Sequence, residues 1–181
     1  MFLQRLLKPG PARIAGARLY GAVVAQARAA EIYAQLGAPD TPDGRFEVYT
    51  LHVVLVLSRL KGEGPRAAAA SQALFDAYLS GLDNGLRELA VGDLAVGKTM
   101  RKLGEAFYGR AQALEVALAA LPDRSSLEDL LRRTVLGGGA DAGDSHDPGP
   151  LADYVLRLRA ELAATPVERV LEGEIDSAAP V

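Results

Sequence analysis

Residues 81–121 read GLDNGLRELAVGDLAVGKTMRKLGEAFYGRAQALEVALAAL, and most of this stretch carries the longest helical pattern in the chain. Asp93 is placed to cap a helix that begins at Leu94, and Pro122 ends that helix. Between these ends the apolar residues recur at steps of three, four and seven, which places them on one helix face. They are Val96, Met100, Leu103, Phe107, Leu114, Leu118 and Leu121. The pattern therefore predicts one long amphipathic helix over residues 94–121.

Two glycines, Gly104 and Gly109, lie inside this predicted helix. Each glycine costs a helix interior about 1 kcal/mol relative to alanine, so a packing reason is expected for both. A glycine in a helix often marks the place where a neighbouring backbone comes close. We therefore expect a second helix to cross the long one near these positions.

The same stretch matches the phosphate-binding pattern GxxxxGK[ST] at Gly92, Gly97, Lys98 and Thr99. In nucleotide-binding proteins a buried strand leads into this loop and a helix follows it, so that backbone N–H groups surround the phosphates. The residues before Gly92 instead carry leucines at helical spacing. No later hydrophobic run ends in an acidic residue that could hold a metal. Nucleotide binding through this segment therefore stays an alternative, and a short match of this kind also arises by chance.

The rest of the chain predicts further helices, separated by links rich in glycine and proline. The expected segments are residues 13–36, 45–61, 66–81, 82–91 as a shorter helix or turn, 125–137 and 151–164. The middle of residues 45–61 is almost wholly apolar, and we prefer a buried central helix to a strand because the segment is long for a strand. Ser125 and Glu128 have the spacing of a capping box at the start of their helix.

These segments predict an all-α protein with a single-domain bundle of about six to eight helices and one long central amphipathic helix. A chain of 181 residues fits one domain. We expect a flexible N-terminus over residues 1–12, the helical domain over 13–165 and a disordered tail over 166–181.

The composition excludes several classes of protein. Hydrophobic residues make up 49% of the chain and the formal net charge is −3, so no surface for general nucleic-acid binding is expected. Cysteine is absent, which excludes disulfides, thiolate nucleophiles and cysteine metal sites. No apolar run approaches the length of a membrane span, and the first residues do not resemble a secretory signal. We expect a cytoplasmic protein with at most peripheral membrane contact.

Catalytic patterns are not found in the sequence. The two histidines, His52 and His146, lie far apart, and neither a GxSxG motif nor a cluster of metal-ligating residues accompanies them. We interpret His52 as a structural residue of the core helix and His146 as part of a solvated loop. The expectation is therefore a protein that is not an enzyme and holds no cofactor or metal.

A much longer set of residues in the same region resembles the ubiquinol–cytochrome c chaperone family, whose members are assembly factors of respiratory complex III. The segments that carry the likeness are LHVVLVLSRL at 51–60 with its Arg59-Leu60 pair, Asp-x-x-Leu-Arg-Glu at 83–88, Val-Gly-Asp at 91–93, Val-Gly-Lys at 96–98 with Lys102 beyond, and Phe-Tyr-Gly-Arg at 107–110. The likeness covers roughly residues 14–163 and is dense over residues 72–118. It is therefore far more specific than the phosphate-loop pattern that it contains.

The resemblance implies a non-catalytic chaperone that binds cytochrome b, or another complex III subunit, together with a small partner chaperone. Mitochondrial members are expected to act at the ribosome exit. Two departures from the family pattern stand out. Val54 occupies a position where the family leads us to expect tryptophan, and the first eight residues contain only two basic residues and no mitochondrial presequence. We therefore expect a bacterial member that works in the cytoplasm or peripherally at the inner membrane.

A chaperone for a membrane subunit needs an apolar groove with a charged rim, into which an amphipathic client segment fits. By the resemblance we expect the partner-binding residues to be Asp83, Arg87, Asp93, Lys98, Lys102, Tyr108 and Arg110. The structural alternative for Asp83 and Arg87 is an i, i+4 ion pair on one helix, and Tyr108 can belong partly to the core. The alternative for the whole chain is a helical protein–protein adaptor.

Overall fold

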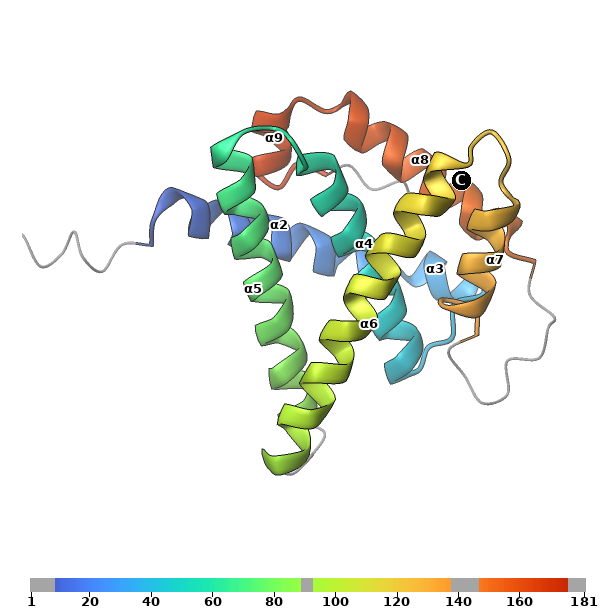
Figure 1. Cartoon of the computed structure of the whole chain (residues 1–181), viewed down its shortest axis with the longest axis horizontal. Coiled ribbons are helices and arrows are strands. Elements are labelled where there is room, and N and C mark those ends of the chain that lie inside the picture. Colours follow the sequence, from blue (N-terminus) through green and yellow to red (C-terminus); the bar gives the residue numbers. More distant parts are fainter. Residues whose placement is uncertain (1–8, 89–92, 138–146, 176–181) are drawn as a thin grey trace, which may run out of the picture.

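A computed structural model of the chain describes residues 9–88, 93–137 and 147–175, and all regular elements in these ranges are helices (Figure 1). They are α2 (Pro11–Ala27), α3 (Ala30–Ala34), α4 (Pro42–Leu60), α5 (Pro65–Glu88), α6 (Asp93–Ala119), α7 (Ser125–Arg133), α8 (Gly149–Ala164) and α9 (Val167–Leu171). The predicted all-α class is confirmed. The predicted long helix is confirmed as α6, although the cap expected from the Asp93 side chain lies outside what the structure describes.

Helix α4 forms the centre of the bundle. Every residue from Thr50 to Val56 is buried, and α4 packs against α2, α5, α6 and α8. A helix that is apolar on all sides is expected to be buried on all sides, so the prediction of a buried helix in this segment is confirmed. The helix begins at Pro42, where the Thr41 hydroxyl oxygen accepts a hydrogen bond of 3.1 Å from the Gly44 N–H.

His52 links α4 to α8 inside the core. Its Nδ1 lies 2.8 Å from the Val48 carbonyl oxygen and its Nε2 lies 2.6 Å from the Tyr154 hydroxyl. Because a carbonyl can only accept, the hydrogen-bond network assigns the proton to Nδ1, and Tyr154 donates to Nε2. Burial lowers the pKa of His52 to about 4 against the opposing bond to Val48. The residue is therefore a neutral structural histidine at neutral pH.

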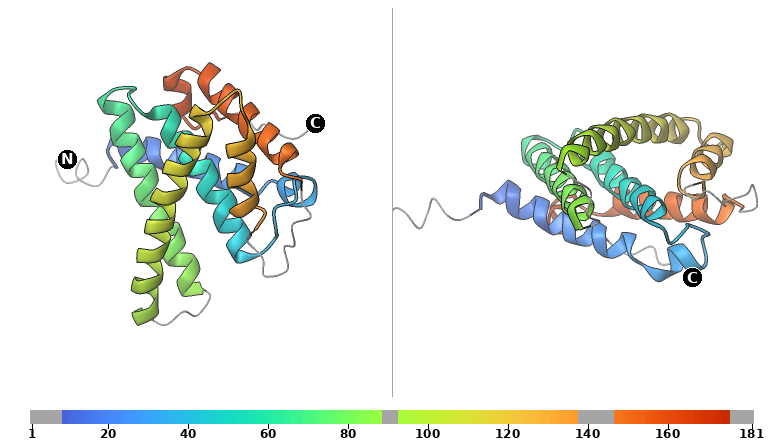
Figure 2. Two further views of the ribbon diagram at one scale, coloured as in Figure 1. Left: turned by 45° about the vertical axis from the view of Figure 1, so that its right-hand side comes forward. Right: turned by 90° about the horizontal axis from the view of Figure 1, so that it is seen from below.

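Helix α2 crosses α5 closely at Gly16. A Cβ atom on Gly16 would lie 2.5 Å from the Ala73 Cβ and 2.8 Å from the Ala73 carbonyl carbon. Only glycine therefore allows these two backbones to approach so closely. Past the crossing, the C-terminal half of α5 runs beside α6 as an arm that extends beyond the other helices (Figure 2).

The close approach expected at Gly104 and Gly109 is wrong, because a Cβ atom at either position would meet nothing within 4 Å. The prediction of one helix over residues 13–36 is also wrong, since α2 ends at Ala27 and α3 begins at Ala30. The Tyr33 hydroxyl donates a 2.6 Å hydrogen bond to the Ala27 carbonyl oxygen, which satisfies a free acceptor at the end of α2.

Helix α5 is continuous where the sequence favoured a break near residue 81. Its apolar stripe continues through Tyr78, Leu82 and Leu86, and the packing of this stripe outweighs the roughly 1 kcal/mol cost of a helical glycine. The start of α7 differs as well, because the Asp123 carboxylate accepts from the Ser125 N–H at 2.9 Å and no capping box forms.

Residues 166–175, which belong to the tail predicted to be disordered, are ordered. They include α9, which buries Val170 and Leu171, and Ile175 is also buried. The Gln26 side-chain N–H donates a 3.0 Å hydrogen bond to the Ile175 carbonyl oxygen, so the tail is fastened to α2. The few apolar residues of this polar segment are buried against the bundle, and composition alone does not reveal this contact.

We predict that Gly16→Ala lowers the free energy of unfolding by about 1–3 kcal/mol, because the added methyl group overlaps the α5 backbone. Gly21→Ala on the same helix is the matched control, since its Cβ would meet nothing within 4 Å. That control is expected to stabilise the helix by up to about 1 kcal/mol. Urea unfolding of both variants checks the prediction, and equal stabilities would contradict the close crossing.

A second prediction concerns the acid sensitivity of the core. The pKa of His52 is depressed in the folded state, so its stabilising contribution is complete above pH 6.5 and is lost as the pH falls toward 4. The unfolding free energy should drop by about 3 kcal/mol across this window through this residue. The difference between wild type and His52→Gln, measured by denaturant unfolding at several pH values, isolates the effect. A difference that does not vary with pH would refute it.

Candidate functional site

A groove opens between α2, α4, α5 and α6. Figure 2 shows the arrangement of these four helices from below. The volume of the groove is about 450 Å³, within the range of protein binding sites. The lining residues are Tyr20, Val24, Ala27 and Arg28 from α2 and its end, Tyr33 from α3, Pro42, Asp43, Arg45, Phe46 and Tyr49 from α4, Gly81, Leu82, Gly85 and Leu86 from α5, and Thr99 and Leu103 from α6.

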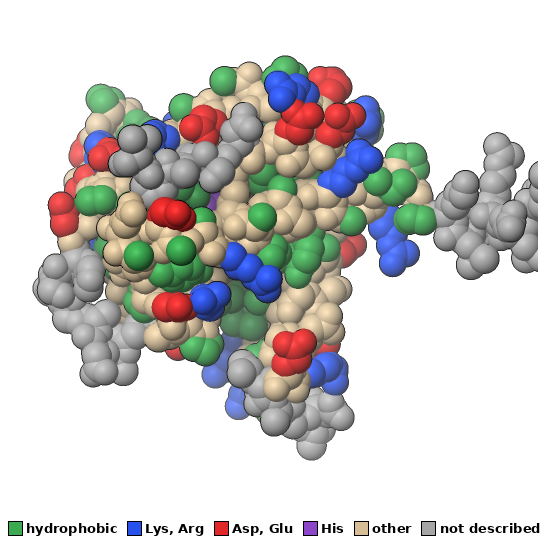
Figure 3. Space-filling view, turned by 180° about the vertical axis from the view of Figure 1, so that it is seen from behind, with side chains coloured by type: hydrophobic (Ala, Val, Ile, Leu, Met, Phe, Trp, Pro, Cys, Tyr) green, Lys and Arg blue, Asp and Glu red, His purple; other side chains and the backbone are tan. Residues whose placement is uncertain are grey.

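The floor of the groove is apolar and its edge is charged. Figure 3 shows the molecule from the α2 side, with apolar side chains in the hollow and basic and acidic side chains around it. Gly81 and Gly85 lie on the wall of the groove that α5 forms. A Cβ atom on Gly81 would lie 2.4 Å from the Tyr20 hydroxyl oxygen, whereas one on Gly85 would meet nothing within 4 Å. The Tyr20 side chain therefore lies directly against the backbone of α5.

Tyrosines join the groove to the core. The Tyr20 and Tyr49 rings meet edge to face at 6.1 Å between centroids, and the Tyr49 and Tyr78 centroids are 5.0 Å apart. The Tyr78 hydroxyl shares a 2.8 Å hydrogen bond with Thr50. The Tyr49 hydroxyl is buried beside the Tyr20 hydroxyl. Burial, reinforced by the nearby Tyr20 hydroxyl, raises the pKa of Tyr49, so this hydroxyl stays protonated at physiological pH.

Two arginines border the groove. Arg45 has an ion-pair partner, and Arg28 has none among the described residues. Arg45 pairs with Asp40 at 2.5 Å and lies 5.1 Å from the centre of the Tyr33 ring, which is a cation–π distance. Arg28 is exposed at the end of α2, and no ion pair with it occurs in residues 9–88, 93–137 and 147–175. Asp43 lies in the first turn of α4, where the helix dipole favours a negative charge.

The residues predicted to bind the partner do not line this groove. Asp83 and Arg87 form an ion pair of 2.7 Å along α5. Lys98 and Lys102 are exposed on α6, and Asp93 begins that helix with a side chain outside the described part. Tyr108 is 65% exposed and lies beside the Phe75 and Phe107 rings. The residues that line the groove therefore do not include Asp83, Arg87, Lys98, Lys102 or Tyr108.

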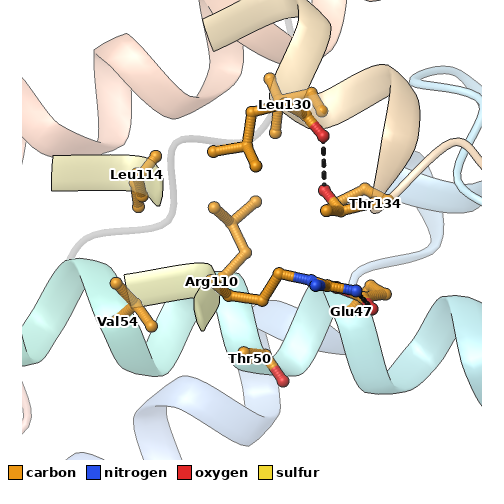
Figure 4. A pocket seen from close by; sticks show the side chains of 10 residues that line it. Glu47, Thr50, Val54, Arg110, Leu114, Leu130 and Thr134 are labelled. Carbon is orange, nitrogen blue, oxygen red and sulfur yellow. Dashed lines mark hydrogen bonds and ion pairs between the residues drawn. The ribbon is translucent and has the colours of Figure 1, made fainter. Parts of the chain in front are cut away.

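Arg110 has a structural partner. Its guanidinium binds both carboxylate oxygens of Glu47, at 3.0 and 2.8 Å, and so joins α6 to α4 (Figure 4). The hydrogen bonds to the Glu47 carboxylate raise the pKa of Arg110 above its ordinary value. The pair borders a small pocket of about 20 Å³ that Val54 and Thr134 also line. A cavity of this size holds about one water molecule and cannot receive a client.

Sequence reasoning missed the groove residues because they come from five helices. Tyr20, Tyr33 and Tyr49 each occur next to an apolar run in the sequence, where an aromatic residue ordinarily reads as core. The signal that could have found them is the concentration of tyrosine in the first 50 residues of a chain that lacks tryptophan. Tyrosine presents an apolar body and a polar tip, which suits a groove that is partly wet.

The geometry gives no support to the phosphate-loop alternative. Residues 65–88 are helical and α6 is already helical from Asp93, so no strand leads into the pattern within the described residues. Groups of histidine, aspartate and glutamate that could hold a metal were not found in that same part of the chain. Of the helices that the structure describes, none is both long enough and apolar enough to span a bilayer.

Comparison with known proteins gave two matches. The sequence profile described as Ubiquinol-cytochrome C chaperone matches residues 34–178, which include α9. The crystal structure of the Cbp3 homolog from Brucella abortus is similar, with a TM-score of 0.80 and 36% sequence identity. The alignment covers 98% of this chain and 96% of the Brucella chain. Comparison with curated proteins gave no match.

We predict that Arg110→Ala lowers the free energy of unfolding by about 1–3 kcal/mol, because it leaves the half-buried Glu47 carboxylate without its partner. Lys102→Ala is the control on the same helix, and a change within about 0.5 kcal/mol is expected for an exposed side chain. Thermal and urea unfolding measure both. If the two variants unfold alike, Arg110 does not hold α6 to α4.

Proposed function

The chain belongs to the ubiquinol–cytochrome c chaperone family, and from this premise we propose that it assists the assembly of respiratory complex III by binding cytochrome b. The observation that carries the proposal is the apolar groove between α2, α4, α5 and α6 in a helical bundle of this family. The protein acts by binding and not by catalysis.

The groove suits a segment of a membrane protein that has not yet reached its final place. Such a segment exposes apolar side chains that would otherwise aggregate in water. The side chains of Val24, Phe46, Leu82, Leu86 and Leu103 offer apolar surface to it. A whole helix is about 10–12 Å wide, so the groove receives the side chains of one helix face and not the entire helix.

The outer face of α6 is a second surface in this proposal. Lys98 and Lys102 are exposed there, and Tyr108 and Val116 are two of the three large exposed apolar residues in the described part of the chain. Charges on such a face speed encounter and fix register more than they raise affinity. We propose that this face, with Asp83, Arg87 and Asp93 near the tip of the arm, contacts the client outside the groove or a small partner chaperone.

The protein is proposed to be a bacterial member that works in the cytoplasm, with peripheral contact with the inner membrane where the client is inserted. A helical adaptor is the competing function. It would use the same groove and would bind other membrane proteins as well as cytochrome b. Selectivity for cytochrome b in a pull-down therefore separates the two functions.

The test replaces apolar groove residues by polar ones of similar size. We predict that Leu82→Gln and Leu103→Gln each reduce co-purification of cytochrome b by about tenfold, because each removes apolar contact from the groove. Deletion of the gene should lower the cellular content of complex III, and the variants should restore it only partly. Quantitative mass spectrometry of tagged protein from cells measures the recovery.

Ile14→Gln is the matched control, because Ile14 is 41% exposed on α2 and does not line the groove. All variants are first compared by circular dichroism and thermal unfolding, so that loss of fold is not mistaken for loss of binding. Full recovery of cytochrome b by folded Leu82→Gln and Leu103→Gln would remove the groove from the proposal. Loss in Lys102→Glu instead would assign binding to the outer face of α6.

A further inference from the structure

One side of the α5–α6 arm carries an apolar surface that does not line the groove. Phe75 and Leu79 lie one turn apart on α5 and are only partly buried, and Tyr108 and Ala111 lie opposite them on α6. Tyr108 is 65% exposed, and its ring centroid is 6.0 Å from that of Phe75, so the two helices present one continuous surface. No other described helix covers this side of the arm in Figure 2. These four residues and Gly104 are called the arm seam below.

Small residues on α6 leave room for another helix at the arm seam. Gly97, Gly104 and Ala111 recur every two turns, so they lie on the same side of α6. A Cβ atom at Gly97 or Gly104 would meet nothing within 4 Å, so packing within the chain does not require a glycine at either position. A helical glycine lowers stability relative to alanine, whereas small side chains at a contact let two helix axes approach closely.

The two helices of the arm carry opposite net charges. Residues 76–88 of α5 contain three acids and one base, whereas residues 98–108 of α6 contain three bases and one acid. Asp83 follows Leu79 by one turn, and Arg101 precedes Tyr108 by two turns, so both flank the arm seam. Because α5 and α6 run antiparallel and Phe75 contacts Tyr108, Asp83 and Arg101 lie at about the same height along the arm (Figure 1). Arg101 is exposed, and an ion pair with it is not found among the described side chains.

We propose that a second copy of this chain packs its arm seam against this one, related by a twofold axis that runs along the arm. Helix α5 of each copy then lies against α6 of the other, and Asp83 of each copy pairs with Arg101 of the other. The two arms complete an antiparallel four-helix bundle, with the aromatic rings and the small residues at its centre. The inference rests on the proposed function in one respect, because it names the partner that contacts Tyr108 and Asp83.

Charge and area both favour a second copy as the occupant. A twofold axis along the arm places each helix against the helix of opposite charge, whereas an axis across the arm would place α5 on α5 and α6 on α6. Residues 72–88 of α5 form a face about 25 Å long, and two adjacent helices make it about 20 Å wide. The face therefore offers about 500 Å² per copy, and the total of about 1,000 Å² is at the low end for specific association. A dimer of this size is expected to dissociate in the micromolar range.

The experiment is sedimentation velocity of the purified full-length chain between about 1 and 100 μM. The mass should rise with concentration from 19.0 kDa toward twice that value. Arg101→Glu and Asp83→Arg should each weaken self-association by about tenfold or more, because each places like charges opposite one another at two symmetric positions. An equimolar mixture of these two variants should associate again, because each introduced charge then faces an opposite one. Lys102→Glu on the exposed side of the same helix is the control and should not change association.

Gly104→Gln gives a second readout, in which stability and association change in opposite directions. The longer side chain meets nothing within its own chain, so the melting temperature should stay the same or rise. The same side chain stands between the two arms, so self-association should fall by about tenfold. Gly109→Gln is the matched control, because Gly109 also has open space around it but lies on another side of α6. That variant should keep the association of the wild type.

The outcomes separate this inference from the proposed function. A chain that stays monomeric overturns the inference, and so does a dimer that Arg101→Glu and Asp83→Arg leave intact or that their mixture fails to restore. The proposed function survives either result if Leu82→Gln still loses cytochrome b. A dimer with the expected response in a chain that recovers no cytochrome b would refute the proposed function alone. If the pure chain is monomeric and Arg101→Glu loses a different protein in the pull-down, the arm seam binds that protein and not a second copy.

Discussion

The contact on which the site depends is the crossing of α2 and α5 at Gly16. Two helix backbones meet there because neither Gly16 nor Ala73 has a side chain that would hold them apart. Helices that touch at one point and are not parallel must separate on both sides of it. On the C-terminal side the space between them is not filled by core residues, and α4 and α6 complete its walls. The groove is thus a geometric result of one close contact that lies outside it.

Contacts outside the groove hold the helices in this open arrangement. Buried α4 is joined to α8 through His52 and Tyr154, and to α6 through the Glu47–Arg110 pair. Aromatic rings of α5 and α6 meet at Phe75 and Phe107, whose centroids are 4.9 Å apart. The contacts at Phe107 and Arg110 fix the base of the arm formed by α5 and α6. The walls of the groove can therefore remain partly apolar without collapsing on one another, because closing them would break contacts elsewhere.

Sequence patterns predicted the helices whose apolar residues follow a local periodicity. They missed the features that depend on contacts between residues far apart in the sequence. The apolar periodicity of α6 and the apolar middle of α4 are local, and both helices were predicted correctly. Gly104 and Gly109 looked like crossing points, whereas the crossing uses Gly16, because local sequence does not show which glycine faces a neighbour. The family resemblance directed attention to Arg110, whose partner Glu47 lies 63 residues away. The groove residues became candidates only when five helices were seen around one volume.

The hydrogen bond between Gln26 and Ile175 joins residues that are 149 positions apart. It has a consequence for the order in which the protein matures. Contacts of such long range form late, because the intervening chain must first be brought together. Helix α2 precedes the other helices that the structure describes, yet its contact with Ile175 forms only after the helices between them have come together. The wall of the groove that α2 forms is therefore completed late in folding.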